Sequence, residues 1–97
     1  MLLQDVKLAL RIMSTDALDS EVEDLIESAR LDLVQSGIDS EKAQDKEPDP
    51  LIKRAIVLYA KANYGLDSPN ADRFQESYDM LKQHLSLSGD YNGRSME

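Results

Sequence analysis

Apolar residues recur every three or four positions in four stretches of the chain, and polar segments separate these stretches. Such spacing places the apolar side chains on one face of a helix. Two of the stretches carry long apolar stripes, from Val22 to Leu33 and from Phe74 to Leu85. No strand-like alternation and no internal repeat competes with this pattern. The sequence therefore predicts an all-α fold, a small bundle of four helices over about residues 3–12, 20–36, 50–64 and 69–86.

Several residues mark the ends of these predicted helices. Ser20 begins a capping-box pattern and so predicts the start of the second helix, with Asp19 as the alternative N-cap. Gly37 can end that helix, because glycine readily adopts the left-handed conformation. Asp49 followed by Pro50 predicts an N-cap and a first helical residue for the third helix. The polar segment between the second and third helices is expected to be a loop with at most one helical turn.

The third predicted helix is apolar over most of its circumference, which predicts a central position in contact with several neighbours. It also gathers three cations, Lys53, Arg54 and Lys61, in one broad sector. One interpretation is that they form the solvated stripe of this helix and pair with the acidic second helix. The other is that they meet an acidic surface of another subunit, in the head-to-tail type of contact that closes rings. Lys53, Arg54 and Lys61 are therefore candidate subunit-interface residues.

The charge of the chain limits its partners. Its 97 residues carry a net charge of −8, and residues 1–48 hold twelve Asp/Glu against five Lys/Arg. This excess of anions argues against a surface that binds nucleic acid or an anionic membrane, since both need clustered cations. The chain has no Cys and no apolar run near the ~18–20 residues that span a bilayer, so we expect a soluble intracellular protein. Its length predicts one helical domain, residues 1–87, followed by a flexible C-terminal tail, residues 88–97.

No arrangement of residues in the sequence predicts catalysis. There is no Cys nucleophile, and the single histidine, His84, has no Ser–Asp partner that the sequence suggests. The four Gly are scattered, so no phosphate-binding loop is present. The segment "DSPNADRFQESY" departs from a calcium loop, because Pro69 and Ala71 occupy ligand positions and Asp72 replaces the required Gly. We therefore expect no enzyme activity, no cofactor and no metal.

Four segments, taken in order, resemble the head–tail connector proteins of tailed phages, which are also called adaptor or DNA-packaging proteins. The segments are "LLQDVKLALRI", "STDALDSEVEDLIESA", "DPLIKRAIVLYAKANYG" and "YDMLKQHLSLSGDY". The residues that match the family pattern are Val6, Lys7, Leu10, Arg11 and Ile12, then Leu25, Ile26 and Ala29, and then Pro50, Leu51, Ala55 and Tyr64. The resemblance covers nearly the whole chain. Two segments depart from the pattern, namely "NYGLDSP" and the acidic loop at 38–49.

This resemblance implies a structural subunit of a virion or prophage. About a dozen copies would form a ring beneath the portal, extending the DNA channel and joining head to tail. The implied partners are further copies of the chain, the portal protein and a tail-completion or stopper protein, in the virion and in the host cytoplasm during assembly. DNA would pass through an acidic channel without specific binding.

The resemblance also implies a role for the C-terminal tail, in which Tyr91 and Arg94 are candidates for docking on the portal. They are expected to order only on that partner. The alternative to the whole reading is a small helical protein–protein interaction module without a ring-forming or phage role.

Overall fold

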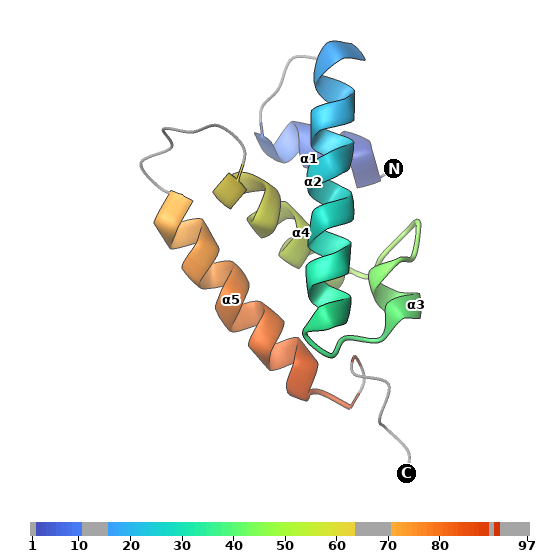
Figure 1. The fold of residues 1–97 in the computed structure, drawn as a ribbon, viewed down its shortest axis with the longest axis vertical. Helices are drawn as coiled ribbons and strands as arrows, with labels where there is room; N and C mark the ends of the chain where they lie inside the picture. The colour runs from blue at the N-terminus through green and yellow to red at the C-terminus, as the bar shows by residue number, and fades with distance from the viewer. Residues whose placement is uncertain (1, 11–15, 64–70, 90, 92–97) are drawn as a thin grey trace.

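The computed structural model describes residues 2–10, 16–63, 71–89 and 91 (Figure 1). The helices in this part of the chain are α1 (Leu2–Leu10), α2 (Asp16–Gln35), α3 (Ser40–Ala43), α4 (Pro50–Asn63) and α5 (Ala71–Leu87). No strand occurs among the described residues, and the predicted all-α fold is confirmed. The short α3 lies in the segment that the sequence predicted to be a loop with at most one helical turn.

Asp49 caps α4 as predicted. Its Oδ1 accepts hydrogen bonds from the backbone N–H groups of Leu51 and Ile52, both at 3.0 Å. Pro50 is the first helical residue. The backbone N–H at that position would make no intrahelical hydrogen bond, so the lack of an N–H in proline costs nothing. The start of α4 is therefore fixed by local chemistry.

Gly37 ends α2, also as predicted. Its φ of 105° lies in the region that L side chains rarely adopt. The Gly37 N–H donates to the carbonyl of Val34, and the Ile38 N–H donates to the carbonyl of Leu33, at 3.0 and 3.1 Å. These two bonds form a Schellman motif, and the buried side chains of Leu33 and Ile38 accompany it.

The predicted start of α2 is wrong. The helix begins at Asp16, one turn before Ser20, so neither Ser20 nor Asp19 is its N-cap. A capping pattern indicates only that a helix can begin at that residue. The residues before it include Ala17 and Leu18, which favour helix strongly, and the helix continues upstream through them.

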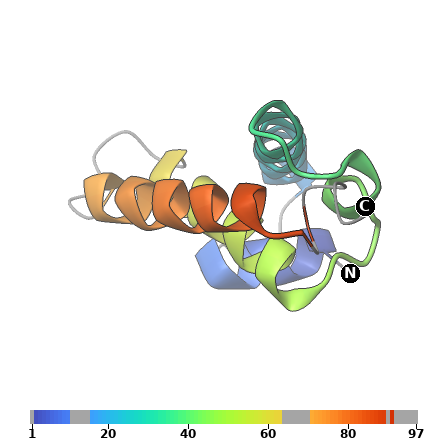
Figure 2. The ribbon, with the colours of Figure 1, turned by 90° about the horizontal axis from the view of Figure 1, so that it is seen from below.

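Helix α4 occupies the centre of the fold, as predicted from its apolar circumference. It contacts α1, α2 and α5. Figure 1 shows it between the two long helices, and Figure 2 shows it crossing behind α5. Its buried side chains are Ile52, Ala55, Ile56 and Ala60. Residues from α1, α2 and α5 complete the same core, among them Val6, Val22, Leu33, Tyr78 and Leu85.

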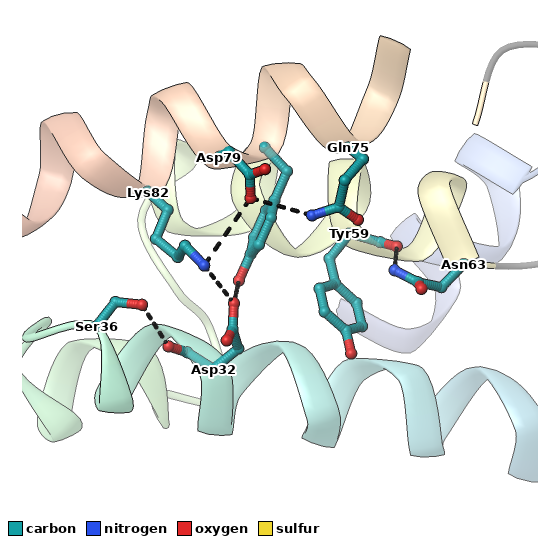
Figure 3. Close-up of polar contacts among 8 residues, drawn as sticks. Asp32, Ser36, Tyr59, Asn63, Gln75, Asp79 and Lys82 are labelled. Carbon is teal, nitrogen blue, oxygen red and sulfur yellow. Dashed lines mark hydrogen bonds and ion pairs between the residues drawn. The ribbon is translucent and has the colours of Figure 1, made fainter. Parts of the chain in front are cut away.

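A polar cluster joins α2 to α5 at the edge of this core (Figure 3). The Tyr78 hydroxyl donates to Asp32 Oδ2 at 2.6 Å, and Lys82 Nζ donates to the same oxygen at 2.8 Å. Tyr78 is fully buried, and its ring meets that of Tyr59 edge-on with 5.3 Å between centroids. Burial and the neighbouring Asp32 carboxylate raise the pKa of Tyr78, so this hydroxyl stays a donor at physiological pH.

Tyr91 packs against the folded domain. Its carbonyl accepts a hydrogen bond from the Asp39 N–H at 2.7 Å, and Lys42 Nζ lies 5.4 Å from the centre of its ring. The half-buried side chain borders the core. Tyr91 therefore lies against residues 39–42 in this structure, and its ordering on a partner stays a prediction.

Candidate interaction surfaces

The three cations of α4 have different environments. Lys53 Nζ binds Asp5 Oδ2 on α1 at 2.9 Å, and this hydrogen bond and charge lower the pKa of Asp5. Lys61 Nζ lies 5.2 Å from the centre of the Phe74 ring, in a cation–π contact with α5. Arg54 is exposed and forms no ion pair or hydrogen bond with any residue that the structure describes. Among the described residues, then, none of the three pairs with α2, and Arg54 is the cation most available to a partner.

Two adjoining hollows follow the outer seam between α4 and α5, and we call them together the basic groove. The first has a volume of about 440 Å³ and is lined by the three cations with Val57, Leu58 and Phe74, and by Pro48 and Pro50 at one end. The second, also about 440 Å³, is lined by Arg54, Leu58, Ser77, Met80, Leu81 and His84. The hollows share Arg54 and Leu58, so they form one continuous surface.

The basic groove is free of acidic residues among the described residues that line it. This is unusual for a chain with 19 Asp/Glu and 11 Lys/Arg. Apart from the three cations, Ser77 and His84, the rest of the lining is apolar, and it includes Met80, which is 68% exposed. Helical spacing places Arg54 on the side of α4 opposite the buried Ile52, so the groove faces solvent. A surface that combines cations with exposed apolar side chains suits an acidic protein partner.

A second hollow, which we call the acidic pocket, lies between α1, α2 and the segment before α4. Its volume is about 470 Å³. Leu2, Leu3 and Ile26 provide its apolar lining, and its acidic residues are Glu23, Asp24, Glu27 and Glu47. All four acidic residues are exposed, so they form a negative rim around an apolar floor.

Arg30 also lines the acidic pocket and is the one buried charged residue among those described. Only 8% of its surface is exposed, and its Nε has no hydrogen-bond partner. No carboxylate among the described residues forms an ion pair with it, although acidic side chains stand on the same rim. A buried N–H without an acceptor is costly, so the Arg30 Nε is an unsatisfied group at the wall of the acidic pocket.

Sequence reasoning found the cations on α4 but missed Phe74 and Arg30. A signal for Arg30 was present, because it lies four residues after Ile26 and three before Leu33 on the apolar stripe of α2. A cation on such a stripe is buried when the helix packs. Phe74 gave no comparable signal, since its contact with Lys61 depends on how α4 and α5 pack.

The remaining predicted site residues are distributed as follows. Tyr91 lies against residues 39–42, away from the cations of α4, and Arg94 lies outside the described residues. His84 is exposed and lines the basic groove. In the described part of the chain, no group of three or more His, Asp or Glu could hold a metal ion. No helix there is both long enough and apolar enough to span a bilayer.

Comparison with known proteins gives a family match over nearly the whole chain. Residues 2–92 match the family described as phage connector protein. No curated protein and no solved structure matches the chain. The matched range contains every helix described above, and with them the basic groove and the acidic pocket.

Proposed function

Because the chain belongs to the phage connector protein family, we propose that it is a head–tail connector subunit of a tailed phage or prophage. Copies of it form a ring beneath the portal, extend the DNA channel and join head to tail. The observation that carries this proposal is the family match across residues 2–92. The family is a structural one, which implies a non-enzymatic protein.

The proposed partners are other copies of the chain, the portal protein and a tail-completion or stopper protein. Membership of the connector family implies partners in the phage head or tail and a place in the virion. Assembly would take place in the host cytoplasm. The all-helical fold, with its interaction surfaces on the outside of the bundle, suits a subunit that packs beside copies of itself.

Lys53, Arg54 and Lys61 contribute to the contact between subunits in this proposal. Arg54 provides the exposed charge, since Lys53 already binds Asp5 and Lys61 lies over Phe74. Those two contacts hold the lysines along the basic groove while leaving both side chains half-exposed. The three cations therefore present a positive edge to an acidic surface.

The negative net charge of the chain suits a DNA channel. Each subunit carries a net charge of −8, so a ring of subunits repels the phosphate backbone. DNA therefore passes without specific binding. We expect no retention of duplex DNA by the assembled ring in a filter-binding assay at physiological salt, and tight binding there would contradict the channel proposal.

The C-terminal segment is proposed to dock on the portal through Tyr91 and Arg94. The proposed boundary after residue 87 separates a helical body from the tail, residues 88–97, in which Tyr91 packs against the core. Arg94→Ala is the cleaner test of docking, because it leaves the Tyr91 side chain and its contacts with Asp39 and Lys42 unchanged in sequence. Unchanged portal binding by Arg94→Ala and by a chain ending at residue 91 would remove the docking proposal.

The experiment that tests the proposed function is light scattering with and without purified portal protein, followed by negative-stain imaging. We expect a closed ring of about a dozen subunits, alone or on the portal. A monomer or dimer that does not bind the portal would refute the connector proposal. It would favour a small helical interaction module instead.

A further inference from the structure

We propose that neighbouring subunits bind through two named surfaces, the basic groove of one copy and the acidic pocket of the next. This inference rests on the proposed function and specifies which faces of the chain meet. The occupant of the acidic pocket is therefore a second copy of this chain, with its Arg54 placed against the rim formed by Glu23, Asp24 and Glu27.

The two surfaces of a single chain are complementary in charge. The described residues that line the basic groove include Lys53, Arg54 and Lys61 and no Asp or Glu. The acidic pocket has four carboxylates against Lys46 and the buried Arg30. Two copies that each carry a net charge of −8 repel one another in most orientations. Placing the basic groove against the acidic pocket replaces that repulsion with attraction, so the charges select a head-to-tail orientation.

Both surfaces also have apolar parts that can pack together. Leu2, Leu3 and Ile26 line the acidic pocket, while Leu58 and the exposed Met80 line the basic groove. Contact between these residues would bury apolar surface inside a ring of opposite charges. Subunit interfaces commonly have this composition, with an apolar centre and a polar rim.

Arg30 is part of the surface that a second copy would cover at the acidic pocket. Its guanidinium is buried, its Nε has no acceptor, and the described residues supply no ion pair to it. The Nε itself is enclosed within the fold, so a partner would meet only the rest of the Arg30 side chain where it lines the acidic pocket.

The two surfaces are distinct, which makes the contact heterologous. Arg54 lies on the outer side of α4, whereas the acidic pocket lies between α1 and α2. A copy bound through its basic groove still presents its own acidic pocket to a third copy. Repetition of this contact gives a ring when the rotation between copies closes.

Charge reversal tests this pairing in the full-length protein, by sedimentation velocity and by imaging of assemblies on the portal at low ionic strength. Arg54→Glu and Glu27→Lys should each weaken assembly about tenfold or more, because each brings like charges together. An equimolar mixture of the two variants should assemble again. Each junction in the mixture is then either the wild-type pair or the pair with both charges reversed.

Matched controls separate a local effect from a change in net charge. Arg73→Glu and Glu76→Lys make the same charge changes at exposed α5 positions that line neither surface, and both should assemble like the wild type. Arg30→Met should keep or raise the thermal midpoint of the isolated protein, because it removes a buried charged group whose Nε has no partner.

The outcomes distinguish this inference from the proposed function. Wild-type assembly together with equal assembly of Arg54→Glu and Glu27→Lys would overturn the pairing of the two surfaces and leave the connector function standing. Failure of the mixture to recover assembly would also overturn the pairing. Failure of the wild type to assemble, alone or on the portal, would refute the connector function itself.

Discussion

Replacing Tyr78 by Phe tests whether the polar cluster between α2 and α5 stabilises the fold. The substitution removes only the hydroxyl that donates to Asp32 Oδ2 at 2.6 Å. The buried ring keeps its edge-on contact with Tyr59 and its place in the core. Asp32 keeps its bond from Lys82, so no charge is left without a partner.

The expected loss follows from the strength of a hydrogen bond to a charged acceptor. Such bonds contribute about 1.5–3 kcal/mol. The Asp32 side chain is 36% exposed, so water replaces part of the interaction and the estimate falls to about 1–2 kcal/mol. For a domain of this size, that loss lowers the thermal midpoint by roughly 5–15 °C. Urea unfolding followed by circular dichroism at 222 nm measures the free energy directly.

Tyr59→Phe is the matched control. Its hydroxyl has no hydrogen bond to any residue that the structure describes, and Figure 3 shows it apart from the Asp32 cluster. We expect a change within about 0.5 kcal/mol. Equal effects of Tyr78→Phe and Tyr59→Phe, or a loss below about 0.5 kcal/mol for Tyr78→Phe, would refute the reasoning that this bond stabilises the fold.

Three further predictions concern pH and helix ends. Partial burial raises the pKa of Asp32, but the hydrogen bonds from Lys82 and Tyr78 and the lysine charge lower it below 3.8 overall. Asp32→Asn should therefore lower the free energy of unfolding by its full amount above pH 3.8. Below that pH the difference between the variant and the wild type should shrink, and urea unfolding at a series of pH values measures it. Gly37→Ala should destabilise by about 1–2 kcal/mol in thermal unfolding, through backbone strain at positive φ. Steric clash would not contribute, because an added Cβ meets Ser86 at an ordinary 3.9 Å. Asp49→Ala should cost about 1 kcal/mol by urea unfolding, and Asp49→Asn should recover most of it, because both Asp and Asn cap helices well.

The elements that the sequence predicted well are those with local causes. The centre of α2 and the whole of α4 follow from apolar spacing, and Asp49 and Gly37 act on backbone groups within four residues of themselves. The start of α2 was missed because two local effects compete there. A capping pattern at Ser20 competes with helix-favouring residues before it, and sequence alone does not rank the two effects.

The interaction surfaces could be predicted only in part. Arg54 was identifiable as a cation on a mostly apolar helix. The contact between Lys53 and Asp5 joins residues 48 positions apart and depends on how α1 packs against α4. Lys61 and Phe74 likewise meet only because α5 packs against α4. Sequence patterns state which side chains share a helix face, whereas the pairing of faces is decided by packing.

The contacts of Tyr91 link the end of the chain to α3. The Asp39 N–H that binds the Tyr91 carbonyl belongs to the residue that also caps α3, where Asp39 Oδ1 accepts from the Glu41 N–H. A partner that pulled Tyr91 away would have to break this bond and the contact with Lys42, which weakens its apparent affinity. By thermodynamic linkage the reverse also holds. A ligand that holds residues 39–42 in place would weaken the binding of a partner that pulls the C-terminus away. In the proposed connector, this small segment then sets the order in which a portal and a tail protein bind the subunit.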